Sequence, residues 1–363
     1  MATCTGVPCG RVHAFSFPFF QVMGSMVRFS FVRAWGVALL GASLMLGAAS
    51  AMADTSRIAV ADQFGLGSLL WNVVKDQKLI EKHGKAAGVD IAVEWKRLSG
   101  GAAMNEAVLS GSIDVGTGGV PPLLTLWDRT RGRQEVKAIS AIVSTPHYLV
   151  TNQPRIRSLD DFSDADRIAV PAVNVSIQAR LLQMAAAKQH GQAQFNRYDA
   201  LTVALPHADA TSVLLAGGNA VVGSFAGEPF TTLALRNPSV HKVISSYEIL
   251  GGPHTVNLIW ATSRFREREP KAYRAVLAAL AEAQTFVQAD PQAAADVFLR
   301  QGDSSLPREQ VLALIQNPET RYTLVPENTF PFARFMHQVG AIKHLPASWK
   351  DYFFEEAYAL GGS

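Results

Sequence analysis

Short polar residues and glycines recur in five segments where an apolar run gives way to a helical pattern. Glycine exposes its backbone N–H, and serine, threonine and asparagine add small hydroxyl or amide donors. None of the five segments contains Lys or Arg. Backbone donors at the positive end of a helix can hold an anionic group without a formal counter-charge. The pattern therefore favours recognition of a small anion by dipoles, and the alternative is that these residues only punctuate loops. The segments are residues 61–68, 99–103, 116–122, 172–178 and 223–229.

The candidate donors fall into two groups. Backbone N–H groups come from the glycines, and hydroxyl or amide groups come from short polar side chains. The glycines are Gly100, Gly101, Gly116, Gly118, Gly119 and Gly223, and the side chains are those of Ser99, Thr117, Asn174, Ser176 and Ser224.

Two acids in these segments each allow two interpretations. Glu228 either pairs with a ligand ammonium group, which together with an anionic head would suit a zwitterion, or caps the helix that begins at Pro229. Capping is the favoured interpretation, and Asp62 has the same two alternatives. The aromatic rings of Phe64 and Phe225 could wall an apolar part of a ligand. Trp71, one turn into a helix, is interpreted as core.

Sequence patterns typical of catalysis are missing. Residues 54–363 contain no Cys, which excludes a thiol nucleophile, a disulfide and a thiolate metal site. The eight histidines of this region are scattered, with no His-x-x-x-His pair and no carboxylate cluster at metal spacing. Neither a Gly-x-Ser-x-Gly elbow nor a P-loop is present. We therefore expect no catalytic residue, no metal and no cofactor.

The elements that position these segments occur twice along the chain. Both halves begin Arg-Ile-Ala-Val, at residues 57–60 and 167–170, and both continue through a loop and an amphipathic helix to a His-Gly pair. In each half the residues that follow predict a strand, a helix and a further strand. This β-α-β-α-β order forces parallel strands with helices on the faces, so we expect two similar α/β lobes. The predicted elements cover residues 89–95, 102–109 and 113–115, then 200–205, 210–215 and 220–222.

Two extended stretches are expected to join the lobes. Residues 142–150 lead into the second lobe, and a return crossing is expected near residues 254–259. A few backbone rotations in such crossings can turn one lobe against the other, so they form a hinge. Ligands of open parallel sheets sit beyond the carboxyl ends of the strands, which places the five segments around the gap between the lobes.

The tail beyond residue 266 reads as almost wholly helical. Pro270, Pro291 and Pro307 mark three helix starts, and two further helices are expected near residues 332–342 and 347–360. Their apolar stripes need a surface to cover, so they should pack on the first lobe. The fold class is therefore α/β with two lobes, each a mostly parallel sheet flanked by helices, and a helical C-terminal extension.

Charge and the N-terminal pattern bear on location. Residues 1–53 hold three of the 33 Lys and Arg residues and no acid, so the remainder balances 30 basic against 30 acidic side chains. A neutral body has no electrostatic footprint for nucleic acid. Met26 is the simpler choice of start residue, because an export signal normally begins at the terminus. From Met26 the pattern is that of an export signal, with two arginines, an apolar run and a cleavage site at Ala51-Met52-Ala53. An uncleaved membrane anchor is the alternative. No Cys follows the apolar run, which argues against a lipid anchor.

The sequence resembles a known family of transport proteins. The export signal, the duplicated lobes and the string Leu-Ser-Gly-Ser-Ile-Asp-Val-Gly-Thr-Gly-Gly-Val-Pro-Pro at residues 109–122 resemble the periplasmic substrate-binding proteins of ABC importers for aliphatic sulfonates, nitrate and taurine. The likeness covers about residues 57–275. It implies the type II periplasmic-binding-protein fold and ligand contacts from Gln63, Phe64, Gly100, Gly101, Thr117, Gly118, Asn174, Ser176 and the region of Ser224 to Glu228.

This chain departs from the family pattern in two places. The absence of Cys from the body argues against the branch that binds or builds the pyrimidine of thiamine with a cysteine-rich segment. Sulfonate binders often carry Trp-Asp-Pro where this chain has Gly-Glu-Pro at residues 227–229. The second departure concerns which ligand binds and leaves the transport role untouched.

These observations predict a monomeric, exported periplasmic receptor that captures a small anionic or zwitterionic solute and delivers it to an ABC permease and ATPase. The alternatives are an exported enzyme acting on a small anion and a ligand-sensing partner of a membrane regulator. The expected organisation is an N-terminal extension and signal over residues 1–53, lobe 1 over 54–145, lobe 2 over 146–254, and a return to lobe 1 with the C-terminal helices over 255–363.

Overall fold

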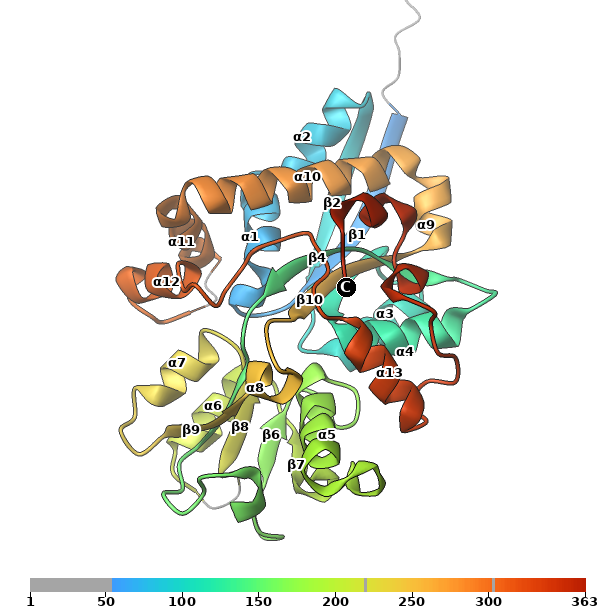
Figure 1. Cartoon of the computed structure of the whole chain (residues 1–363). Coiled ribbons are helices and arrows are strands. Elements are labelled where there is room, and N and C mark those ends of the chain that lie inside the picture. The colour runs from blue at the N-terminus through green and yellow to red at the C-terminus, as the bar shows by residue number, and fades with distance from the viewer. Residues whose placement is uncertain (1–53, 219–220, 302–303) are drawn as a thin grey trace, which may run out of the picture. The chain divides into compact units, whose positions relative to one another are not determined.

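The computed structural model describes residues 54–218, 221–301 and 304–363, and the predicted export signal lies outside these residues. Two five-stranded sheets organise the described chain (Figure 1). The first has the strand order β2-β1-β3-β10-β4 and the second β7-β6-β8-β5-β9. We call the elements around the first sheet lobe 1 and those around the second sheet lobe 2. The strands are β1 (Asp54–Asp62), β2 (Val89–Arg97), β3 (Val115–Gly119), β4 (Val136–Ser144) and β10 (Thr255–Thr262) in lobe 1, and β5 (Tyr148–Thr151), β6 (Ile168–Val170), β7 (Thr202–Ala204), β8 (Gly223–Ala226) and β9 (His241–Ser245) in lobe 2.

Four strands of each sheet run in one direction, and one strand runs against them. In lobe 1, β1 pairs parallel with β2 and β3, while β10 lies antiparallel between β3 and β4. In lobe 2, β6 pairs parallel with β7 and β8, while β5 lies antiparallel between β8 and β9. The predicted α/β class with two mostly parallel sheets is therefore confirmed. Each antiparallel strand is the first strand in the sequence after the chain has crossed from the other lobe.

The duplicated segments occupy equivalent places in the two sheets. The Arg-Ile-Ala-Val repeats fall in β1 and at the start of β6, and each of these strands pairs with the next two strands of its own half. The third strand of each half, however, begins later than the sequence pattern predicts. Strands β3 and β8 include the glycines that we placed in loops after them. Glycine is required within β3, because a Cβ on Gly116 or Gly118 would lie 2.8 Å from the ring of Trp260 on β10.

Helices cover the sheets and form the tail. The predicted helix starts at Pro270 and Pro291 are the first residues of α10 and α11, and the carboxylate of Asp290 accepts a hydrogen bond from the backbone N–H of Ala293 in the first turn of α11. Instead of a helix over residues 347–360, the structure has two short 3₁₀ turns. The α-helices are α1 (Leu69–Asp76), α2 (Leu79–Ala86), α3 (Gly101–Leu109), α4 (Val120–Thr130), α5 (Ile177–His190), α6 (His207–Leu215), α7 (Phe230–Leu235), α8 (Ser246–Leu250), α9 (Ser263–Arg268), α10 (Pro270–Ala289), α11 (Pro291–Arg300), α12 (Arg308–Ile315) and α13 (Phe330–Gln338).

The tail packs on lobe 1. Helix α10 packs across α1 and α2 (Figure 1) and buries Tyr273, Val276, Leu280 and Val287, whose spacing places them on one face of the helix. Helix α13 contacts α4, also in lobe 1. No helix of the described chain combines the length and the apolar character needed to cross a bilayer.

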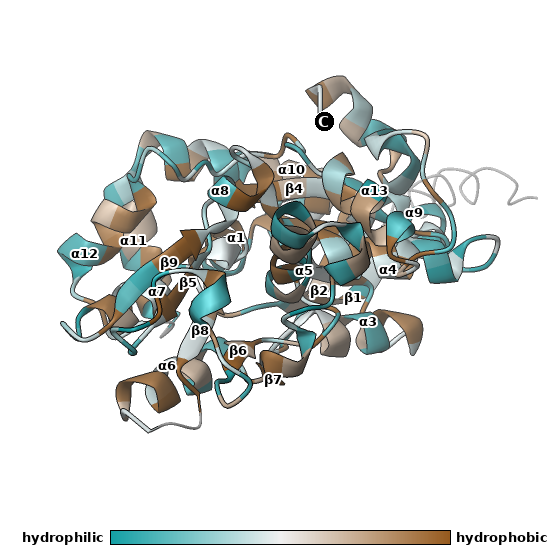
Figure 2. Ribbon diagram, turned by 60° about the horizontal axis from the view of Figure 1, so that its bottom comes forward, coloured by the Kyte–Doolittle hydropathy of each residue, from teal (hydrophilic) through white to brown (hydrophobic). Residues whose placement is uncertain are grey.

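One hydrophobic core cluster includes residues of both lobes. It contains Val120 and Leu123 of α4 in lobe 1 together with Ile177 and Leu181 of α5 in lobe 2, and these two helices are in contact. A second cluster lies within lobe 1 and the tail. Strands β5 and β6 of lobe 2 are coloured as hydrophobic in Figure 2, as expected for strands buried beneath helices.

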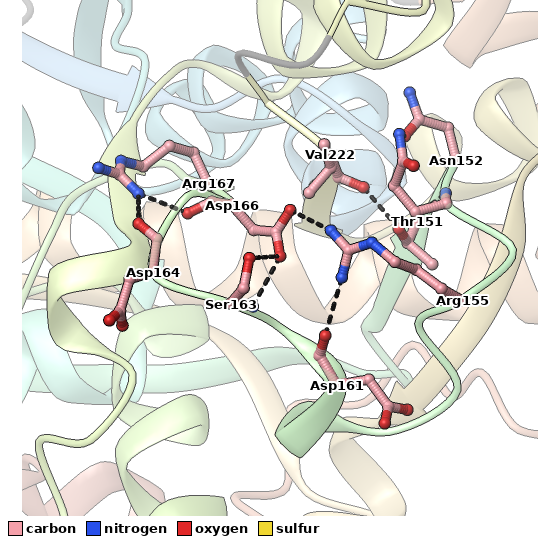
Figure 3. Close-up of polar contacts among 10 residues, drawn as sticks. Thr151, Asn152, Arg155, Asp161, Ser163, Asp164, Asp166, Arg167 and Val222 are labelled. Atoms are coloured by element: carbon pink, nitrogen blue, oxygen red, sulfur yellow. Dashed lines mark hydrogen bonds and ion pairs between the residues drawn. The ribbon is translucent and has the colours of Figure 1, made fainter.

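The long connection between β5 and β6 is held by its own polar contacts (Figure 3). Arg155 donates to the carboxylate of Asp166 and to the backbone carbonyl of Asp161. The same Asp166 carboxylate accepts hydrogen bonds from the backbone N–H and the hydroxyl of Ser163. Thr151, at the end of β5, donates its hydroxyl to the carbonyl of Val222. These contacts fix the start of β6, whose far end leads to the site described next.

Candidate functional site

A cavity of about 330 Å³ is lined by residues from both lobes and from the tail. Its walls are built from the loops that follow the carboxyl ends of the parallel strands, from β4, β10 and the first crossing between the lobes (residues 145–147), and from α12 and the segment that follows it. The side chains and backbone that line it are those of Gln63, Phe64, Leu66, Gly67, Ser99, Gly100, Gly101, Gly119, Pro122, Val143, Thr145, His147, Pro171, Ser176, Ile177, Gln178, Pro206, His207, Ala208, Asp209, Gly227, Glu228, Phe230, Asn257, Leu314, Thr320 and Tyr322.

The N-terminal ends of three helices line this cavity. Helix α3 reaches it through Gly100 and Gly101, α5 through Ser176 and its first residues, and α6 through its first turn. The first backbone N–H groups of a helix have no acceptor within the helix and carry the positive end of its dipole. Neither α3 nor α6 has a side-chain cap. These helix starts can therefore donate to an anionic group in the cavity.

The cavity wall of the described chain holds no Lys or Arg, although it holds the acids Asp209 and Glu228. Glu228 precedes α7, and its Oε2 accepts a hydrogen bond from the backbone N–H of Thr232 at 3.0 Å. Burial raises the pKa of the Glu228 carboxyl, and hydrogen bonds from Thr232 and the charge of Lys242 partly offset this effect. Glu228 thus caps a helix, as the sequence favoured, and lines the cavity as well.

Two histidines line the cavity beside a shared glutamine. Nδ1 of His147 lies 3.0 Å from the side-chain nitrogen of Gln178, and Nε2 of His207 lies 3.5 Å from the same nitrogen. Burial and the neighbouring His207 and His254 hold the pKa of His147 well below its usual range, and burial lowers the pKa of His207 to about 4. Both rings are therefore neutral at pH 7, and their facing nitrogens accept hydrogen bonds from the Gln178 amide.

The wall at His147 also depends on a glycine. A Cβ on Gly227 would clash with Nε2 of His147, so any larger residue at position 227 would displace the histidine ring. On the other side of the pair, the ring of His207 stacks on Phe230 with ring centroids 5.3 Å apart. Both histidines are thereby held in place by packing as well as by Gln178.

The lobes touch each other around the cavity. The backbone N–H of Leu66 in lobe 1 donates to the carbonyl of Glu228 in lobe 2 at 3.0 Å. A Cβ on Gly119 in lobe 1 would lie 3.1 Å from the Cβ of Ile177 in lobe 2. The absence of side chains at such points lets the two walls approach closely enough to surround a small molecule.

Six of the ten residues singled out from the sequence line the cavity. They are Gln63, Phe64, Gly100, Gly101, Ser176 and Glu228. Phe64 is 49% exposed and its ring lies 5.0 Å from the guanidinium carbon of Arg97. Ser176 caps α5, since its hydroxyl oxygen accepts from the backbone N–H of Ala179.

The structure places the other four residues, Thr117, Gly118, Asn174 and Ser224, outside the cavity wall. Thr117 and Ser224 are buried within strands rather than exposed in loops, and the hydroxyl of Thr117 donates to the carbonyl of Leu258. Gly118 lies in the same strand as Thr117, and a Cβ added to it would lie 3.4 Å from the side-chain nitrogen of Gln63. The Asn174 side chain accepts from Gln183, and its backbone adopts a positive φ of 59°.

The structure also shows where the acids and the aromatic residues singled out from the sequence lie. Asp62 is buried and paired with Arg97, whose Nη2 lies 2.7 Å from Oδ2. Phe225 is fully buried in the core cluster and does not line the cavity, so its interpretation as a ligand wall is wrong. Trp71 is fully buried, as expected of a core residue.

Sequence reasoning missed several lining residues. His207 belongs to the second-half loop that corresponds to Ser99–Gly101 in the duplication, so that correspondence could have identified it. Thr145 and His147 lie in the first crossing, and Tyr322 lies in the tail, where no local pattern indicates a site. Within the described residues, no group of three or more His, Cys, Asp or Glu side chains is arranged to hold a metal ion.

Comparison with known proteins identifies the family. The sequence matches the NMT1-like family over residues 70–299. The chain belongs to the NMT1-like family. No curated protein sequence matches this NMT1-like chain significantly.

Solved structures share the fold of this NMT1-like chain. The alkanesulfonate-binding protein SsuA from Xanthomonas axonopodis pv. citri, bound to MOPS, is 18% identical, with a TM-score of 0.63 over 84% of this chain and 98% of its own. The periplasmic aliphatic sulphonate-binding protein SsuA from Escherichia coli is 19% identical, with a TM-score of 0.59 over 84% and 99%. The periplasmic nitrate-binding protein NrtA from Synechocystis PCC 6803 is 14% identical, with a TM-score of 0.60 over 84% of each chain. The fold is thus that of periplasmic binding proteins, and these structural neighbours are binding proteins rather than enzymes.

Proposed function

We propose that the protein is the solute-binding receptor of an ABC importer. It captures a small anionic or zwitterionic solute, such as a sulfonate, nitrate, taurine or a related organic acid, in the cavity between its lobes and delivers it to a membrane permease. The observation that carries this proposal is the cavity itself, which both lobes line and into which three helix N-termini open. A volume of about 330 Å³ suits a small solute.

The position of the cavity supports a capture mechanism. Residues 145–147 and 252–254 are the two crossings, and His147 on the first of them lines the cavity. A solute that contacts both lobes stabilises the closed arrangement over an open one, because only the closed form makes both sets of contacts. The closed form is then the one that the permease recognises. The export signal predicted before Asp54 and the binding roles of the structural neighbours support a function outside the cytoplasm.

The experiment is a calorimetric and thermal-shift screen of the purified protein. The panel contains ethanesulfonate, taurine, nitrate, acetate and, as an uncharged control, glycerol. We expect at least one anionic or zwitterionic member to bind, to raise the melting temperature and to be recovered unchanged. Binding of no member, or conversion of a bound member into a product, would overturn the receptor proposal.

A matched pair of variants locates the binding. Gln178→Ala removes the amide between His147 and His207, so we expect at least a tenfold loss of affinity for the bound solute. Gln338→Ala changes an exposed glutamine at the end of α13, outside the cavity, and should bind as the parent does. Equal affinity of all three proteins would place the binding elsewhere. Delivery is tested separately, since deletion of the gene should abolish cellular uptake of the solute that calorimetry identifies.

A further inference from the structure

Tyr322 reaches the cavity from the tail and has an unused hydroxyl group. The residue lies between α12 and α13 and is only 6% exposed. Tyr322 lines the cavity, and its buried hydroxyl has no hydrogen-bond partner among the described residues. Burial and the nearby charge of Glu228 raise the pKa of Tyr322, so the phenol stays protonated at neutral pH. A buried hydroxyl without a partner costs free energy unless a bound molecule supplies one.

Glu228 lines the same cavity and lacks a cation there. Thr232 donates to its carboxylate, but no Lys or Arg of the described chain lines the cavity beside it. Lys242, the cation that acts on it electrostatically, has its Nζ 3.6 Å from the centroid of the Tyr148 ring instead. A largely buried carboxylate without an adjacent cation favours a ligand that carries positive charge.

We propose that Tyr322 and Glu228 form a subsite for an ammonium group of the solute. An ammonium group has three N–H donors, of which one can donate to the Glu228 carboxylate and another to the Tyr322 hydroxyl oxygen. The anionic group of the same solute is then held by the starts of α3, α5 and α6. This inference rests on the proposed receptor function and narrows its ligand to amino-bearing organic acids, which excludes nitrate and simple sulfonates as the preferred solutes.

The segment that carries Tyr322 also touches both lobes. The backbones of Arg321 and Ser144 exchange two hydrogen bonds at the end of β4 in lobe 1. The Tyr148 hydroxyl of lobe 2 donates to the carboxylate of Glu319, and the hydroxyl of Thr145 lies 2.8 Å from that of Thr320 in the first crossing. Tyr322 is therefore held at the cavity by neighbours on each side, which gives its hydroxyl a fixed position.

The test compares acids that differ only in the amino group. Calorimetry at pH 7.5 measures taurine against ethanesulfonate and β-alanine against propionate on the parent protein. We expect the amino-bearing member of at least one pair to bind tenfold or more tightly than its partner. Equal or tighter binding of the members without the amino group, or binding of nitrate alone, would overturn the subsite while leaving the receptor function intact. Absence of binding by every solute would overturn both.

Three variants assign the preference to the named groups. Glu228→Gln keeps an oxygen for the Thr232 N–H but removes the charge, and it should reduce the preference for the amino-bearing acid at least tenfold. Tyr322→Phe keeps the ring and should reduce it about threefold to tenfold. Tyr358→Phe removes a hydroxyl that donates to the Lys350 carbonyl away from the cavity and should leave it unchanged. An unchanged preference in both cavity variants, with thermal unfolding showing intact folds, would refute the assignment.

Discussion

A serine joins the two crossings between the lobes. The Ser246 hydroxyl oxygen accepts a hydrogen bond from the backbone N–H of His147 in the first crossing, and it lies 2.9 Å from Nε2 of His254 in the second. Nδ1 of His254 lies 3.0 Å from the carbonyl of Thr255. These partners assign the proton to Nδ1 and leave Nε2 as an acceptor for the serine hydroxyl. In this arrangement the histidine is neutral.

Acid should weaken the fold through this histidine. Burial lowers the pKa of His254 from 6.5 to about 4, so the unfolded chain takes up the proton first. The stabilisation is then fully present above pH 6.5 and is lost as the pH falls towards 4, by about 3 kcal/mol at most. Urea unfolding at pH 7.5, 6 and 5 measures this loss. His254→Gln should reduce the pH dependence, to which the buried His147 and His207 also contribute, whereas His337→Gln, at an exposed position, should keep it in full. Equal slopes in both variants would contradict the assignment to His254.

Single residues of the site differ in how far they could be predicted. Gly100 and Gly101 follow a strand and begin a helix, and this local order alone indicates the edge of a sheet where ligands bind. Tyr322 and His147 have no such local signal, because they reach the cavity only after distant segments have packed together. Ser176 was predicted as a ligand contact, and the structure adds its role as the cap of α5.

At the scale of elements, strand β3 shows why glycine is a poor guide to strand ends. Glycine usually marks a turn, which led us to end the strand before Gly116. Here the glycines continue the strand because the Trp260 side chain of β10 lies across them. The packing partner is about 140 residues away in the sequence, so no local pattern could reveal it. For the same reason Thr117 and Gly118 lie in strand β3 and not in the predicted loop.

Gly118→Ala should destabilise lobe 1. Its new Cβ would lie 2.8 Å from Cη2 of Trp260, and an overpacked core site of this kind costs about 1–3 kcal/mol. Gly218→Ala is the matched control, because position 218 is exposed and a Cβ there meets no atom within 4 Å. Urea denaturation of the two variants gives the comparison. If Gly118→Ala lost no more stability than Gly218→Ala, the Trp260 ring could move aside without cost, and the prediction would be wrong.

At the scale of the whole molecule, the sequence duplication predicted the two sheets but not their odd strands. The repeated β-α-β-α-β order accounts for β1, β2 and β3 and for β6, β7 and β8. The antiparallel strands β5 and β10 lie outside the repeat, in the segments that read only as extended crossings. Their places in the sheets depend on pairing with strands of high sequence separation, which periodicity does not encode.

A chain that ends at residue 253 should fail to complete lobe 1. It retains every strand of the second sheet but lacks β10, which pairs with both β3 and β4. We expect the shortened chain, residues 54–253, to lose the cooperative thermal transition that residues 54–363 show. Circular dichroism during heating measures both transitions. A single sharp transition at an unchanged temperature in the shortened chain would contradict this expectation.

The late arrival of β10 has a consequence for biosynthesis. Lobe 1 is begun first and finished last, since lobe 2 is a continuous insertion between β4 and β10. Until residue 262 has been synthesised, the nascent polypeptide carries the facing edges of β3 and β4 without the strand that joins them. Open edges of this kind invite pairing with other chains. A chaperone that holds the chain unfolded until its synthesis is complete would protect it during that interval.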